Sequence, residues 1–275
     1  MPDLYIVATP IGNLEDITLR ALRVLRESSL IAAEDTRKTI RLLAKYDIKT
    51  PMTSYYEHSK LTKIEYILSY LSKGDVALVS EAGTPGINDP GYKLIQEAIK
   101  RGINIIPIPG PSVVVSALVI SGLPTDSFTY LGFLPNKSGL RKKLLETVRN
   151  QSATLVTLEA PHRVKASLND ILSILGDRRV AICRELTKIH EEVYRGSVKQ
   201  AIVHFAMPKG EFTLVIEGKH DKPVPEMTDE VEKCLITLHN NGIPAKEAIA
   251  ILAKETGLSR KELYQKWLEL KKSPI

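Results

Sequence analysis

Short apolar runs alternate with amphipathic helical patterns along the first 121 residues, and this alternation limits the possible folds most strongly. The runs typical of buried strands are residues 4–8, 30–33, 76–80 and 104–108. Helical patterns cover residues 36–46, 59–72, 92–101 and 112–121, and an earlier one, capped by Asp16 or Thr18, runs to Glu27. Strands that are apolar along their whole length suit a sheet covered on both faces. The alternation predicts an α/β architecture with a largely parallel sheet.

A break at residues 122–127 separates this segment from a second α/β segment. Its candidate strands are residues 128–132, 154–158, 179–183, 190–194 and 212–217. Its candidate helices are residues 138–149, 163–175 and 197–206.

The remainder of the chain has a different pattern. Residues 218–227 contain Pro223 and Pro225 among several charges, as linkers do. Three amphipathic helical patterns follow at residues 228–240, 244–256 and 259–271, the last with a capping box formed by Ser259 and Glu262. We therefore predict four segments: an N-terminal α/β domain over 1–122, a second α/β domain over 123–218, a linker over 219–227 and a helix-turn-helix-like domain over 228–275.

Net charge and cysteine content limit the class of protein. The 275 residues carry a net charge of +6 with a pI near 9.1, which favours a polyanionic partner without establishing one. Two cysteines exclude a disulfide scaffold and a cysteine-rich zinc site, so we expect a reduced, cytoplasmic compartment. Residues 1–8 lack the features of a signal peptide, and no run approaches the ~20 apolar residues of a membrane span.

The common catalytic and cofactor motifs are missing from the sequence. It has no P-loop, no GxGxxG dinucleotide fingerprint, no HExxH zinc motif and no GxSxG nucleophile elbow. The six histidines are scattered without metal-ligand spacing, so no metal site is expected.

Three loops rich in glycine and proline each follow a predicted strand, at residues 8–13, 80–91 and 107–112. Glycine lets a backbone approach a ligand closely, and ligands in open α/β sheets bind at the carboxyl ends of the strands. The three loops together therefore favour a ligand site over the alternative of three tight connections.

Several charged segments allow two readings each. Residues 34–37 either position a substrate or begin a helix capped by Asp35 or Thr36. In residues 159–163, His162 and Arg163 either bind a phosphate or are solvated. The basic segment 137–149 is either a phosphate-contacting or a solvated helix face. The basic tail, residues 245–275, has a helix–turn–helix pattern that suits nucleic acid or protein binding.

Five segments, in order, carry a family resemblance: LYIVATPIGNL at residues 4–14, AEDTR at 33–37, SEAGTPGINDPG at 80–91, PGPS at 109–112 and EAPHR at 159–163. Together they closely resemble the small-subunit ribosomal RNA methyltransferase I (RsmI) family, within the tetrapyrrole-methylase superfamily. The likeness runs from residue 4 to about residue 217, and the tail helices resemble this family's C-terminal helix-turn-helix domain.

The resemblance implies a two-domain tetrapyrrole-methylase fold with S-adenosylmethionine in the interdomain cleft, generally as a homodimer. The absence of a long apolar run separately predicts no membrane partner. It implies methylation of the 2′-hydroxyl of a decoding-centre cytidine in 16S rRNA, within the small ribosomal subunit. Thr84 stands where many tetrapyrrole methylases have an acidic residue, which argues against a porphyrinoid substrate. The residues that match the family's cofactor loops are Pro10, Gly83, Thr84, Pro85, Ile87, Ser112, Val113 and Leu158.

A ribose hydroxyl is a poor nucleophile at neutral pH, so a base or a nearby cation would assist methyl transfer. The candidates are the carboxylates Asp35, Glu81, Glu159 and Glu185 and the cations Arg37 and Lys188. Position in the loops favours Glu81 and Asp35, with Lys188 as the cation.

Two other functions stay open from the sequence. One is a relative in the same superfamily that methylates a small molecule or a modified protein residue, although the basic tail and Thr84 count against it. The other is a non-enzymatic, ligand-sensing regulator whose tail binds nucleic acid, and a preference for duplex DNA over structured RNA would identify it.

Overall fold

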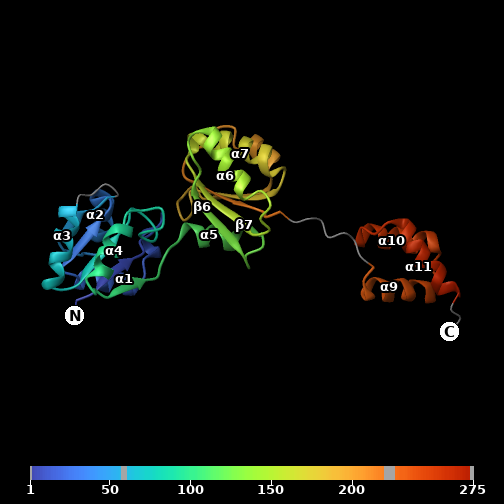
Figure 1. The fold of residues 1–275 in the computed structure, drawn as a ribbon, viewed down its shortest axis with the longest axis horizontal. Helices are drawn as coiled ribbons and strands as arrows, with labels where there is room; N and C mark the ends of the chain where they lie inside the picture. The colour runs from blue at the N-terminus through green and yellow to red at the C-terminus, as the bar shows by residue number, and fades with distance from the viewer. Residues whose placement is uncertain (1, 57–60, 220–226, 273–275) are drawn as a thin grey trace. The chain divides into compact units, whose positions relative to one another are not determined.

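The computed structural model describes residues 2–56, 61–219 and 227–272, and the chain divides into two compact units, Met1–Lys219 and His220–Ile275 (Figure 1). Residues 220–226 of the predicted linker and residues 59–60 of a predicted helix lie outside the described residues. Among the described residues, no helix combines the length and apolar character needed to cross a membrane.

The first sheet of the first unit is entirely parallel, with strand order β3-β2-β4-β1-β5. Its strands are β1 (Leu4–Val7), β2 (Leu30–Ala33), β3 (Met52–Ser54), β4 (Val76–Val79) and β5 (Ile105–Ile108). Its helices are α1 (Leu19–Glu27), α2 (Thr36–Lys45), α3 (Leu61–Ser69) and α4 (Tyr92–Lys100), with short 3₁₀ turns at Leu14–Asp16 and Tyr70–Ser72. The predicted parallel α/β architecture is confirmed here.

Side-chain alternation along these strands separates two cores. Val7 packs with residues of α1 and α2, whereas Leu4 and Ile6 pack with residues of α3 and α4 on the opposite face. Because both faces are covered, the strands are apolar throughout. The edge strand β3 was not predicted, since a strand of three residues, two half-buried and one exposed, carries no strong pattern.

The second sheet is mixed, with strand order β6-β7-β10-β8-β9, and only β6 and β7 pair in parallel. Its strands are β6 (Phe128–Phe133), β7 (Thr154–Glu159), β8 (Arg179–Arg184), β9 (Glu192–Ser197) and β10 (Phe212–Ile216). The antiparallel pairing of β8 and β9 follows from the short turn at residues 185–191, because a parallel pair would need a longer crossover.

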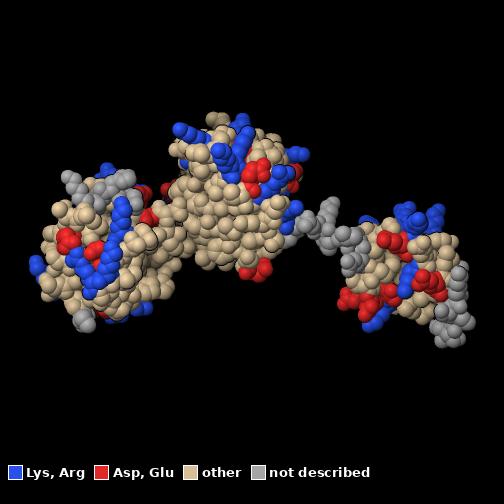
Figure 2. Space-filling view, viewed as in Figure 1, with Lys and Arg blue, Asp and Glu red and all other residues tan. Residues whose placement is uncertain are grey.

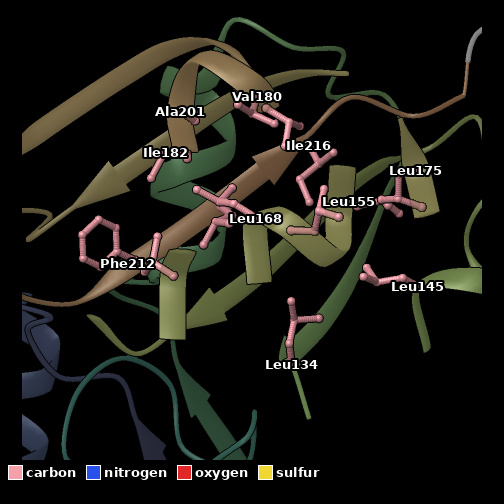
Figure 3. Packing of buried hydrophobic residues seen from close by; sticks show 14 of the residues in the cluster. Leu134, Leu145, Leu155, Leu168, Leu175, Val180, Ile182, Ala201, Phe212 and Ile216 are labelled. Carbon is pink, nitrogen blue, oxygen red and sulfur yellow. The ribbon is translucent and has the colours of Figure 1, made fainter. Parts of the chain in front are cut away.

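Helices cover both faces of this sheet. One face packs on α6 (Ser138–Thr147), α7 (Pro161–Leu175) and α8 (Val198–His204), around the buried cluster drawn in Figure 3. The other face packs on α5 (Val113–Ser121), through residues such as Ala117 and Leu118. The predicted domain boundary after residue 122 stays a prediction, although this packing assigns α5 to the second sheet.

The second unit consists of three helices, α9 (Asp229–Asn240), α10 (Ala245–Thr256) and α11 (Arg260–Lys272). They enclose a small apolar cluster in which Trp267 is 3% exposed, as expected for a core residue. The capping box before α11 is confirmed, since Glu262 N donates to Ser259 Oγ and Ser259 N donates to Glu262 Oε2.

Candidate active site

A cavity of about 430 Å³ in the first unit is bounded by the loops after β1, β4, β5 and β7. Apolar side chains form much of its wall, among them Ile11, Val113, Val114, Phe133, Leu158 and Leu186. The loops after β1 and β4 are joined by two backbone hydrogen bonds between Thr9 and Gly83, at 2.8 and 2.9 Å. Because β1, β4 and β5 are parallel neighbours, their carboxyl ends bring the three glycine- and proline-rich loops to one edge of the sheet.

Most of the predicted cofactor-binding residues surround this first cavity. Those that line it are Gly83, Thr84, Ile87, Ser112, Val113 and Leu158. Pro10 lines a neighbouring cavity instead, and Pro85 is buried and lines neither. Gly83 has a φ of +76°, a conformation that side chains other than glycine rarely adopt. Binding by these residues stays a prediction.

A second cavity of about 400 Å³ adjoins the first. The two share four lining residues, Ile11, Glu81, Ala82 and Glu211. Three basic residues also line the second cavity, namely Lys38, Arg41 and Lys188. An apolar cavity and a basic cavity therefore meet at Glu81.

The loop after β1 is in close contact with the turn after β8. A Cβ placed on Gly12 would lie 2.5 Å from Thr187 Oγ1 and 2.8 Å from the carbonyl oxygen of Leu186, so only glycine fits there. In the same turn, Glu185 and Thr187 have φ values of +51° and +65°. Such backbone strain is common at functional sites, and here it brings Lys188 to the wall of the second cavity.

Three of the carboxylates on the wall of the first cavity belong to the loops after β2 and β4: Glu34, Glu81 and Asp89. The Glu81 N–H donates to Glu34 Oε2 at 3.0 Å, and the Glu81 carboxylate pairs with Lys38. Burial and the nearby Glu34 raise the pKa of Asp89 to about 6, against a hydrogen bond with Ser80 that lowers it. Burial, with a contribution from Asp35, also raises the pKa of Glu34.

Sequence reasoning did not select Glu34 or Asp89 as catalytic candidates. Glu34 lies in the charged segment 34–37 and Asp89 lies in the loop 80–91, and the sequence analysis discussed both segments. They are distinguished by the fold, because both are half-buried and line the first cavity although they are 55 positions apart in the chain. No local pattern reports such a contact.

The structure separates the three predicted catalytic residues. Asp35 lines neither cavity and caps α2, accepting a hydrogen bond from Arg37 N at 2.9 Å and pairing with the Arg37 guanidinium at 3.1 Å. These hydrogen bonds from Arg37 hold the pKa of Asp35 below its usual value. Glu81 lines both cavities, and Lys188 lines only the second.

Lys188 is held by two carboxylates, with Nζ 3.0 Å from Glu185 Oε1 and 3.1 Å from Glu211 Oε2. Burial disfavours the charged form of Lys188, but hydrogen bonds to Glu185 and Glu211 outweigh it and raise its pKa. Lys188 is therefore a permanent cation at neutral pH and not a proton acceptor.

Glu159 at the end of β7 and Arg163 in the first turn of α7 form a structural ion pair. The Glu159 side chain is fully buried, 3.0 Å from Arg163 Nε, and also accepts hydrogen bonds from Ala160 N and Ser167 Oγ. Arg163 is thus neither solvated nor free to bind a phosphate, although Glu159 lines the first cavity.

Comparison with protein families covers most of the chain. Residues 3–202 match the model of the tetrapyrrole (corrin/porphyrin) methylases. The chain belongs to the tetrapyrrole methylase family. Residues 225–271 match the RsmI C-terminal HTH domain, so this family member carries the tail module that the sequence analysis expected.

Curated relatives within the family extend over most of the chain. The protein is 48% identical over 273 residues to "Ribosomal RNA small subunit methyltransferase I" of Halalkalibacterium halodurans, covering 95% of this chain and 93% of that protein. It is 49% identical over 222 residues to the protein of the same name from Thermotoga maritima, covering 80% of this chain and all of that protein.

Solved structures confirm the predicted fold of the family. A diphthine synthase superposes with a TM-score of 0.64 at 16% identity, covering 78% of this chain and 90% of that one. A uroporphyrin-III-C-methyltransferase from Thermus thermophilus superposes with a TM-score of 0.56 at 20% identity, covering 78% and 94%. At these identities the likeness concerns the fold alone.

The raised pKa of Asp89 predicts a pH-dependent stability for this family member. The pKa of an aspartate in an unfolded chain is about 3.9, so the native state binds this proton more tightly than the unfolded chain does. The stabilisation is fully present below about pH 4 and is lost as the pH rises through about 6. Asp89→Asn should therefore flatten the decline in unfolding free energy between about pH 4 and pH 7, measured by chemical denaturation. Asp126→Asn, at an exposed position, is the matched control, and an equal slope in both variants would refute the effect.

Proposed function

We propose that this protein transfers a methyl group from S-adenosylmethionine to the 2′-hydroxyl of a cytidine in the 16S rRNA of the small ribosomal subunit. The observation that carries the proposal is the match of one chain both to the tetrapyrrole methylase model and to the RsmI C-terminal domain. Relatives named ribosomal RNA small subunit methyltransferase I, 39–49% identical over most of the chain, support the rRNA substrate. We further propose a cytoplasmic homodimer.

The first cavity suits the methyl donor chemically. S-adenosylmethionine supplies an activated methyl group on a positively charged sulfonium. An apolar wall that includes Val113 and Leu158 fits the uncharged part of such a donor, and the carboxylates of Glu34 and Asp89 offset its positive charge. Gly83 and Thr84, together with Ile87 and the other lining residues of the cofactor set, would hold it.

Glu81 is the strongest candidate for the general base. It is the carboxylate beside Lys38 at the boundary between the two cavities, where an acceptor can meet the donor. Its carboxylate accepts the proton of the ribose hydroxyl, and the Lys38 ammonium fixes its orientation. Lys188 lines the second cavity between Glu185 and Glu211, where its ammonium can donate a hydrogen bond to an acceptor oxygen. Asp35, which is engaged as a helix cap, orients the start of α2.

The test is transfer of labelled methyl from S-adenosylmethionine to 30S subunits purified from a strain that lacks the modification. Nuclease digestion then locates the label. A label on the ribose of a single cytidine is expected. A label on a base, or no label on 30S subunits while the donor is still bound, would contradict the proposal and favour another acceptor.

A further inference from the structure

The second cavity has the position that an acceptor site requires. It shares Ile11, Glu81 and Ala82 with the first cavity, which is the proposed donor cavity, and residues of α2 between positions 38 and 42 also line it. An in-line methyl transfer needs the acceptor oxygen next to the methyl group, so the acceptor must occupy space that is continuous with the donor cavity. The second cavity is such a space.

The charges on its wall are not equivalent. Lys38 is paired with Glu81, and Lys188 is paired with Glu185 and Glu211. Arg41 lies one turn after Lys38 on α2 and is exposed. Within residues 2–56, 61–219 and 227–272, the Arg41 guanidinium makes neither an ion pair nor a hydrogen bond to a side chain, and it lines the second cavity.

We propose that the second cavity binds a phosphate of the rRNA segment that carries the acceptor ribose, with Arg41 as the residue that contacts it. This inference rests on the proposed function. A guanidinium offers a planar fork of N–H donors that matches two phosphate oxygens, and an arginine without an ionic partner loses no existing pair when it binds one. Lys38 and Lys188 also line the cavity, but carboxylates already hold both ammonium groups, so the phosphate contact is assigned to Arg41.

The arrangement also explains why Glu81 is paired with Lys38, which lies on α2 as Arg41 does. Arg41 and Glu81 line the same cavity, so the sugar next to a phosphate bound at Arg41 has access to the Glu81 carboxylate. Helix α2 thus binds the phosphate through Arg41 and holds the general base, Glu81, through Lys38. Phosphate binding and deprotonation of the ribose hydroxyl therefore both depend on α2 rather than on separate loops.

The experiment compares Arg41→Ala with Arg20→Ala in the full-length protein. Arg20 lies on α1, is exposed, and lines neither cavity, so it controls for the general loss of one positive charge. Three quantities are measured: KM for unmodified 30S subunits, equilibrium binding of the same subunits as a function of salt, and the Kd for S-adenosylmethionine.

Arg41→Ala should raise KM and weaken 30S binding by about tenfold and reduce the salt dependence by about one phosphate contact. Its Kd for S-adenosylmethionine should equal that of the wild type, Arg41→Lys should recover part of the loss, and Arg20→Ala should change KM less than about twofold. Equal effects of the Arg41 and Arg20 variants, or weaker donor binding by Arg41→Ala, would overturn the inference. If the wild type binds 30S subunits but methylates no ribose, the proposed function fails, while the binding series still decides the role of Arg41.

Discussion

Replacement of Arg141 by alanine should lower the unfolding free energy of the first unit by about 3–5 kcal/mol. The Arg141 side chain is 5% exposed and its Nε donates to Asp170 Oδ2 at 2.7 Å. Its Nη1 also donates to the carbonyl oxygens of Pro135 and Asn136, both at 3.3 Å, and so fixes the loop before α6. Alanine would leave the Asp170 carboxylate buried with only Ser138 Oγ and the more distant Lys142 as partners.

Chemical denaturation followed by far-ultraviolet circular dichroism measures this loss. Lys143→Ala, in the same helix but exposed, is the matched control and should stay within about 0.5 kcal/mol of the wild type. The single tryptophan, Trp267, lies in the second unit, so its fluorescence follows that unit and its transition should not move. Replacing Arg141 and Asp170 together by apolar residues of similar volume should recover much of the loss. A loss for Arg141→Ala no larger than that of the control would refute the structural role.

Arg141 shows that the basic residues of one segment can have different roles. Residues 137–149 read in the sequence as one basic helix face, and lysine and arginine side chains do gather over α6 and α7 (Figure 2). Yet Arg141 points inward to Asp170, a partner 29 residues further along the chain. The sequence shows the density of basic residues in this segment, but it does not show that Asp170 binds Arg141 and keeps it away from the surface.

Most of the helices and strands were predictable because their signals are local. Of the two predicted caps for α1, Thr18 is the one that accepts a hydrogen bond from Ala21 N, and the predicted capping box of Ser259 and Glu262 precedes α11. The edge strand β3 and the packing of α5 on the second sheet were not predictable in this way, because burial against other elements decides both.

The candidate site divides in the same manner. Strand order brings the three glycine- and proline-rich loops to one sheet edge, so their convergence followed from the α/β pattern. The individual roles did not follow, because Glu34 and Asp35 are neighbours in the sequence with equal claims. Asp35 caps α2, which leaves Glu34 to face the first cavity beside Asp89.

Replacement of Glu81 by glutamine should lower kcat for 30S methylation by about 10²- to 10⁴-fold, the usual contribution of a general base. Glutamine keeps the size of the side chain but cannot accept the proton of the ribose hydroxyl. The Kd for S-adenosylmethionine should change little, because the apolar wall of the donor cavity and the carboxylates of Glu34 and Asp89 remain. The variant should also lose the acidic limb of the pH–rate profile, since that limb reports protonation of the base.

The control for Glu81→Gln is a second ion pair that involves a lysine of α2. Glu15 pairs with Lys45 of α2 at 3.4 Å, as Glu81 pairs with Lys38, but Glu15 is largely exposed and lines neither cavity. Glu15→Gln removes a comparable surface charge and should keep kcat within about twofold of the wild type. If Glu81→Gln behaves like Glu15→Gln, the base lies elsewhere. A loss of kcat in Asp89→Asn would then assign proton transfer to the half-buried carboxylate of Asp89 in the donor cavity. If Glu81→Gln alone is inactive while it still binds donor and 30S subunits, the carboxylate at the junction of the two cavities is the group that activates the ribose.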